Sequence, residues 1–199
     1  IALLLVDKGS IAQEMGIPIS ALAPLVPYLA AWMLGMSTTT ASSISLEGKG
    51  LDQLKVLPVS TRAVFRAKLA LHFAVTLPAE IIAATLFSIA LEADVMQALL
   101  LYLLPAAFSV FVGLAGLWIN LLHPKLDWKN ETEVVKQGFP TFVTVFGSML
   151  LVGIPLALLL LGIMDAPILG YAFTALCALG ALLIWKWLCG KGVRRFAEL

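Results

Sequence analysis

The sequence predicts an all-α fold, a polytopic bundle of membrane-spanning helices. Hydrophobic residues make up 61% of the 199 positions and charged residues 13%, whereas ordinary soluble domains have about 45–50% apolar and about 25% charged residues. The apolar residues form five continuous runs, each close to the roughly 20 residues that an α-helix needs to cross a bilayer core. A water-soluble domain of this size could not bury so much apolar surface.

In chain order, the predicted spans cover residues 17–36, 69–91, 95–122, 139–164 and 167–188. Residues 1–6 are expected to be the last turns of a sixth helix, and we expect the chain to be part of a longer membrane protein. Small residues at helix-packing spacing, such as Ser109 with Gly113, predict closely packed helices. Residues 1–199 are predicted to form one transmembrane domain.

The placement of charge predicts the orientation of the spans. If residues 1–6 lead to the outside, the outer connections hold one basic residue, Lys8, and five acidic ones. The inner connections are residues 47–68, residues 123–138 and the tail from Lys186, and they hold the other twelve Lys and Arg residues. Short loops rich in Lys and Arg stay in the cytoplasm. The sequence therefore predicts a multi-pass membrane protein with its basic loops and C-terminus in the cytoplasm.

The first basic connection, residues 47–68, has the pattern of a helix, a break and a second helix. Leucines recur there at helical spacing, namely Leu51, Leu54 and Leu57. This spacing predicts a short amphipathic helix, which Pro58 ends. Ser60 is expected to cap the helix that continues into the next span. The segment is either an interfacial helix on anionic lipid or a docking element for a cytoplasmic partner.

The second basic connection, residues 123–138, contains "DWKNETEVVKQG". Asn130 followed by Glu133 predicts an N-cap with a capping-box partner, at the start of a helix that continues into Phe139. Trp128 is expected to anchor this loop at the membrane interface. The alternative is a second contact with the cytoplasmic partner.

Glu80 lies in the middle of the span 69–91, two residues after Pro78. A carboxylate at that depth costs on the order of 2.5–3.5 kcal/mol on insertion scales, so it should face the bundle interior or a wet cavity. Glu80 either hydrogen-bonds to a neighbouring helix near the proline or lines a path for substrate or protons.

The sequence contains no motif typical of catalysis or metal binding. The two histidines, His72 and His123, lie far apart, and no His or Cys cluster has metal-ligand spacing. "EGKG" contains Gly-Lys, but Gly50 stands where a phosphate-binding P-loop has Ser or Thr. We therefore expect no enzyme activity, no metal and no cofactor in this chain, and no nucleic-acid partner.

"SSISLEGKGLDQLKVLPVSTR", from Ser42 to Arg62, resembles the cytoplasmic segment of ABC-2-type exporter permeases in a Gram-positive group of ABC exporters. "NLLHPKLDWKNETEVVKQG", residues 120–138, resembles the later cytoplasmic loop of the same group, and the ending "KGVRRFAEL" is similar to its C-terminus. The matches are spread over most of the chain. Members of the group are longer, so the resemblance implies the C-terminal half of a permease.

The resemblance implies a permease component of the bacterial cell (cytoplasmic) membrane, which exports substrate while a separate ABC ATPase subunit binds and hydrolyses ATP. Residues 47–57 would be a coupling helix that receives motion from the ATPase. The residues expected to take part are Glu47, Lys49, Leu51, Leu54, Lys55, Leu57 and Arg62. Other expected partners are the lipid bilayer and a second permease half or a second copy of the chain. Two alternative functions are a proton-coupled secondary transporter that uses Glu80 and a non-transporting membrane scaffold.

Overall fold

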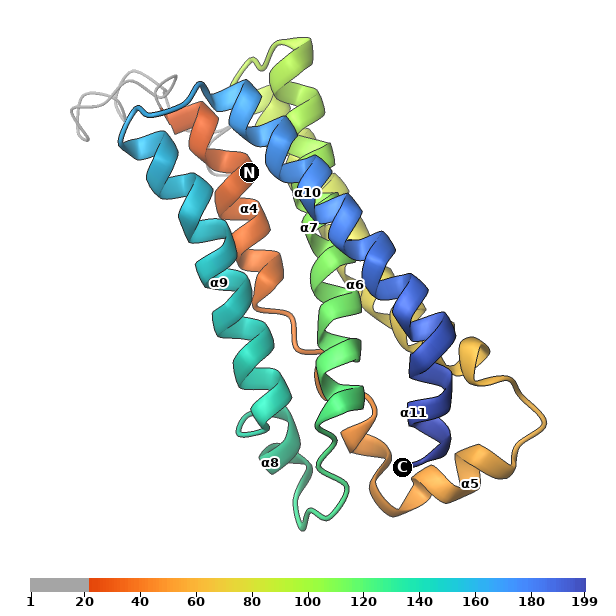
Figure 1. Cartoon of the computed structure of the whole chain (residues 1–199). Helices are drawn as coiled ribbons and strands as arrows, with labels where there is room; N and C mark the ends of the chain where they lie inside the picture. The colour runs from red at the N-terminus through yellow and green to blue at the C-terminus, as the bar shows by residue number, and fades with distance from the viewer. Residues whose placement is uncertain (1–21) are drawn as a thin grey trace.

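The computed structural model describes residues 22–199, which form helices joined by short connections, with no strand among them (Figure 1). Four helices in this part of the chain are apolar and long enough to cross a membrane. They are α6 (Thr61–Ala90), α7 (Val95–Leu122), α9 (Phe139–Leu160) and α10 (Ala166–Trp187). The shortest have 22 residues, or roughly 33 Å at 1.5 Å per residue, which matches a hydrocarbon core of about 30 Å. The predicted all-α polytopic bundle is confirmed.

The four long helices correspond to four of the five predicted spans. Helix α7 begins and ends at the predicted residues, and α9 and α10 differ from the prediction only near their ends. Helix α6 begins at Thr61, before the apolar run, because the capped polar turns at its start are also helical. Residues 1–6 and 17–21 of the predicted spans lie outside the described residues.

Figure 1 shows the two ends of the bundle, which carry opposite charge according to the residues at each end. The end that we call the basic end holds η2 (Ser45–Gly50), α5 (Leu51–Val56), α8 (Glu131–Val135), η3 (Leu188–Gly192) and α11 (Val193–Ala197). The twelve described Lys and Arg residues lie in these elements, in their connections or in the adjoining helix turns. The opposite, acidic end has the turns 91–94 and 161–165, with Glu92, Asp94 and Asp165. The predicted separation of charge is therefore present in the fold.

Helix α7 is at the centre of the bundle. Half of its membrane-length window (50%) is buried, against 22–28% in the other three spanning helices. Near its middle, Phe108 packs against Phe173 of α10, with ring centres 5.9 Å apart. Towards the basic end, Leu117 and Leu121 belong to a second core cluster together with Phe65 of α6.

Large apolar side chains on the other spanning helices point away from the bundle. Examples are Ile82 on α6, Leu150 on α9 and Leu179 on α10, which are 61%, 72% and 55% exposed. Lipid tails are as apolar as these side chains, so such surfaces are suited to contact with the bilayer.

The described part of the first predicted span is shorter than a membrane span. It consists of η1 (Ala23–Leu25) and α4 (Val26–Gly35), and it ends where Gly35 packs against Phe108 at the middle of α7. Residues 37–44 then continue without helix along the second half of α7, where Gly116 packs against Thr40 (Figure 1). Membranes tolerate such non-helical backbone where it is buried in protein. The described part of the first predicted span is therefore a short helix that ends near the middle of α7 and is followed by buried, non-helical chain.

Candidate functional site

A stripe of polar side chains runs along the face of α6 that packs against α7. Its members recur every four residues and therefore lie on one face of the helix. They are Lys68, His72, Thr76 and Glu80. The last three are 0%, 4% and 6% exposed. Placing an ionisable group in the bilayer core costs free energy. Such groups therefore usually face the bundle interior, where they pair or line functional pathways.

His72 is the centre of a hydrogen-bonded network that joins three segments of the chain. Its Nδ1 lies 2.7 Å from the hydroxyl of Thr39, in the non-helical segment 37–44, and its Nε2 lies 3.1 Å from the carbonyl oxygen of Ser109 on α7. A carbonyl oxygen can only accept, so a neutral His72 ring carries its hydrogen on Nε2 and accepts from Thr39. The Ser109 hydroxyl donates to Thr76, and Thr76 donates to the His72 carbonyl oxygen.

Small residues allow the helices to approach closely around this network. A methyl group added at Gly113 of α7 would lie 2.7 Å from the His72 ring, closer than carbon atoms pack. On the other side of α7, a methyl group at Gly170 of α10 would lie 2.5 Å from the Leu100 side chain. The close packing predicted from the small residues is confirmed.

Glu80 lies one helix turn beyond Thr76 and faces the bundle, as its sequence position predicts. Its Oε2 atom has no hydrogen-bond partner among the described residues. The described helices around it carry no charged side chain at a comparable depth. No group of three His, Cys, Asp or Glu side chains that could hold a metal ion occurs within residues 22–199. A buried carboxylate with an unpaired oxygen is stabilised by taking up a proton or a small cation.

Asn120, near the end of α7, fixes the first connection to the bundle. Its side-chain oxygen accepts from the backbone nitrogens of Ile44 and Ser45, at 2.7 and 3.1 Å. Its side-chain nitrogen donates to the Ser45 hydroxyl, which also accepts from the backbone nitrogen of Lys125. Asn120 is fully buried. These bonds satisfy polar backbone groups that the non-helical chain would otherwise leave unpaired.

Trp128 ties the second connection to the first. Its indole N–H donates to the carbonyl oxygen of Ser45 at 2.8 Å, and its ring packs against Gly48. Gly48 has a φ of 50°, a backbone conformation that glycine adopts without steric cost. Trp128, which the sequence suggested as an interface anchor, thus joins the two connections of the basic end.

The three leucines predicted to contact an ATPase do not form one free face. Helix α5 ends at Val56, and Leu57 has an extended backbone, because the residue before a proline is pushed out of the helical region. Leu51 is 2% exposed and belongs to the core, and Leu54 packs against the same core. Leu57 is 52% exposed. Leu51 is therefore not available to a partner.

The free apolar surface of this segment is what we call the apolar tip. It consists of Val56, Leu57 and Val59, which are 83%, 52% and 51% exposed. Lys49 is also exposed, and Lys55 makes a 3.7 Å contact with Asp52 at the surface of α5. The segment thus presents apolar side chains next to basic ones, as the sequence predicts. Of the three predicted leucines, Leu57 alone belongs to the tip.

Glu47 and Arg62, also predicted to couple to the ATPase, hold the segment to its own chain. Glu47 pairs with Lys68 of α6 at 2.5 Å, and Lys68 also donates to the Ser43 carbonyl oxygen. The Arg62 guanidinium donates twice to the carbonyl oxygen of Cys189, at 3.0 and 3.2 Å. Ser60 caps α6 as predicted, accepting from the helix's first turn.

The second connection follows its prediction in part. The Asn130 side chain accepts from the first turn of α8, so the predicted N-cap is confirmed. The Glu133 carboxylate pairs with Lys125 at 3.0 Å. The prediction that this helix continues into Phe139 is wrong, because Gly138 has an extended backbone and separates α8 from α9.

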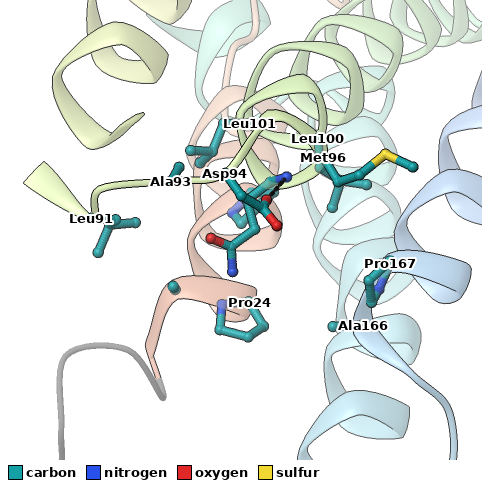
Figure 2. A pocket seen from close by; sticks show the side chains of 12 residues that line it. Pro24, Leu91, Ala93, Asp94, Met96, Leu100, Leu101, Ala166 and Pro167 are labelled. Atoms are coloured by element: carbon teal, nitrogen blue, oxygen red, sulfur yellow. Dashed lines mark hydrogen bonds between the residues drawn. The ribbon is translucent and has the colours of Figure 1, made fainter. Parts of the chain in front are cut away.

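A small pocket of about 190 Å³ lies at the acidic end. Figure 2 shows it bordered by Pro24 near the start of α4, by Leu91 and Ala93 of the α6–α7 turn, and by Pro167 of α10. The Asp94 carboxylate on its wall accepts from the backbone nitrogen of Gln97 and caps α7. None of the residues predicted as functional lines this pocket.

His72, Thr39 and Asn120 were not among the sequence-predicted site residues. The polar stripe itself could be predicted, because polar residues at every fourth position from Lys68 to Glu80 lie on one face of a helix. The partners of His72 and Asn120 come from distant parts of the chain, so no local pattern indicates them.

Comparisons of the chain with curated proteins and with solved structures gave no match. A family model described as "Membrane protein of 12 TMs" matches residues 18–186. The match covers most of the chain, including α6, α7 and α9 in full and α10 except for its last residue. The chain therefore belongs to this family of polytopic membrane proteins.

Proposed function

We propose that the chain is the transmembrane permease component of an ABC-2-type exporter, in which a separate ABC ATPase binds and hydrolyses ATP at the basic end. The observation that carries the proposal is the apolar tip, in which Val56 is 83% exposed at the most polar end of the bundle. Apolar anchors framed by basic residues are suited to a groove in a protein partner. The resemblance of residues 42–62 to exporter coupling segments supports the same function.

The contacts behind the apolar tip support a role in transmitting motion. Helix α5 follows η2 directly, and η2 is attached to α7 through Asn120 and to the second connection through Trp128. The Glu47–Lys68 pair attaches it to α6. A displacement of the tip would therefore be transmitted to the spanning helices α6 and α7.

A groove of about 470 Å³ beside the tip widens the surface on which a partner can dock. Leu54, Val59 and Val64 line it, together with the Glu47–Lys68 pair. Burying one leucine-sized side chain in such a contact contributes roughly 1.5–3 kcal/mol. Val59 belongs to both the tip and the groove, so one partner can contact the two together.

The proposed exporter acts with further membrane spans. The family description counts twelve spans, and the described residues contain four helices of spanning length. This difference supports a second permease half or a second copy of the chain as a partner.

The polar stripe on α6 supports a second candidate function, proton-coupled transport through Glu80. The Glu80 Oε2, which has no hydrogen-bond partner within residues 22–199, and the hydrogen-bonded His72 lie on one buried helix face. This candidate predicts proton entry into vesicles that contain the chain without ATP, reported by a trapped pH-sensitive dye. Glu80→Gln should abolish that entry, whereas the exporter proposal predicts no proton entry without an ATPase.

The exporter proposal is tested by substitution in the apolar tip. Leu57→Asp places a charge where a partner should bury a leucine, so the amount of ABC ATPase that co-purifies with the tagged chain should fall strongly. Lys55→Ala should reduce it less, because charges at the rim of an interface mainly affect association rates. Leu54→Asp is a poor test, because Leu54 also packs in the chain's own core.

Gln53→Asp is the matched control, since it adds the same charge to an exposed position of α5 outside the tip. The variants should insert into the membrane in equal amounts. If Leu57→Asp retains as much ATPase as the wild type, the segment is a lipid-surface helix and the proposal loses its main support.

A further inference from the structure

We propose that the chain binds an anionic phospholipid in a groove between α6, α7 and α10, with the lipid phosphate held by Arg66. The groove has a volume of about 280 Å³ and opens on the outer surface of the bundle, near the basic end. Arg66 is its only charged lining residue among those the structure describes.

The groove has a charged residue at one end and apolar residues along the rest of its length, which is the arrangement of headgroup and acyl chain in a phospholipid. Arg66 and Trp185 lie towards the basic end, and Leu69, Phe73 and Val110 line the part that runs towards the middle of the bundle. Arg66 and Phe73 are seven residues apart on α6, or roughly 10 Å at 1.5 Å per residue. Tryptophan is enriched at the depth of lipid headgroups. A headgroup at Arg66 therefore places an acyl chain along the apolar part.

Arg66 is free to bind a phosphate. The other two basic side chains of this part of α6 already have partners. Arg62 donates to the Cys189 carbonyl oxygen, and Lys68 pairs with Glu47. Arg66 has no hydrogen bond or ion pair within the described part of the chain. A guanidinium donates two parallel hydrogen bonds to phosphate oxygens, which makes arginine well suited to such a site.

Charge at the basic end favours an anionic lipid over a zwitterionic one. The described residues of this end include twelve Lys and Arg but only six Asp and Glu residues. Basic pockets between spanning helices on one side of the membrane are typical sites for anionic headgroups.

The test measures lipid retention by the purified full chain in detergent. Native mass spectrometry would compare phosphatidylglycerol with phosphatidylcholine of the same acyl chains. The wild type should retain one phosphatidylglycerol more tightly than phosphatidylcholine. Arg66→Gln should weaken phosphatidylglycerol binding by about tenfold, the effect of losing charge-assisted hydrogen bonds.

Two further variants separate the groove from general attraction to the basic end. Ala70→Trp fills the groove from an exposed position of α6 while keeping Arg66, and it should abolish the tight binding. Lys129→Gln removes a cation of the second connection, outside the groove, and should leave binding unchanged. Circular dichroism would verify that each variant is folded.

Equal retention of the two lipids by the wild type would overturn the proposal. So would unchanged phosphatidylglycerol binding in both Arg66→Gln and Ala70→Trp. The latter result is expected if another polypeptide segment or a second copy of the chain covers the groove.

Discussion

The side-chain oxygen of Asn120 lies 2.7 Å from the backbone nitrogen of Ile44, so α7 directly supports the non-helical chain that follows α4. The two residues are 76 positions apart. Through this contact, the central helix of the bundle and the connection that carries the apolar tip form one unit. The stability and the proposed coupling function therefore depend on the same buried amide.

Asn120→Leu should destabilise the protein by on the order of 3 kcal/mol, because it leaves the buried backbone nitrogens of Ile44 and Ser45 without an acceptor. Thermal unfolding in detergent would measure the loss. Trypsin should also cleave at Lys49 and Lys55 faster than in the wild type. Asn130→Ala is the control, because it removes the cap of a short exposed helix, and it should cost only about 1 kcal/mol. Equal effects of the two variants would contradict the role of Asn120.

Gly113→Ala should destabilise the protein by about 1–3 kcal/mol, because the added methyl group forces α7 away from the His72 ring. The unfolding midpoint in detergent would report the change. Gly147→Ala on α9 is the matched control, since nothing lies within 4 Å of its added methyl group. That substitution should be neutral or stabilising by about 0.5–1 kcal/mol, because glycine weakens a helix interior. A Gly113→Ala protein as stable as the wild type would contradict the close packing of α6 and α7.

The sequence predicts those parts of the structure in which the interacting residues are close together along the chain. Pro58, Ser60 and the apolar run of α7 determine local structure, and the helix boundaries that they predict are present. The burial of Leu51 could not be predicted, because its helical spacing is the same whether it faces its own core or a partner. The network of His72 requires residues 33 positions before it and 37 after it. Such contacts depend on the packing of the whole bundle.

Glu80→Leu should leave the protein as stable as the wild type or more stable. It removes a buried carboxylate oxygen that has no partner in the described part of the chain, together with the desolvation cost of that oxygen. Glu80→Gln should also fold, since it keeps the size and most of the polarity. The unfolding midpoints of both variants in detergent would check this. A large loss of stability in Glu80→Leu would indicate that a group outside the described residues pairs with the carboxylate.

The basic end should face the cytoplasm. A cysteine introduced at Lys55, Lys129 or Arg194 should be protected from a membrane-impermeant thiol reagent in intact cells, after Cys177 and Cys189 have been replaced. A cysteine at Asp165 should be labelled. The same is expected at Lys8, which lies outside the described residues. Labelling at position 55 and protection at position 165 would contradict this orientation.

The most direct test of the exporter account is the ATP hydrolysis of the assembled protein. The tagged chain, purified in mild detergent and placed in lipid nanodiscs, should carry an ABC ATPase identified by mass spectrometry. ATP hydrolysis should be faster in this complex than in the isolated ATPase, and Leu57→Asp should remove the stimulation while Gln53→Asp keeps it. A wild-type chain that purifies without any ABC ATPase, or one that leaves the ATPase rate unchanged, would contradict the account.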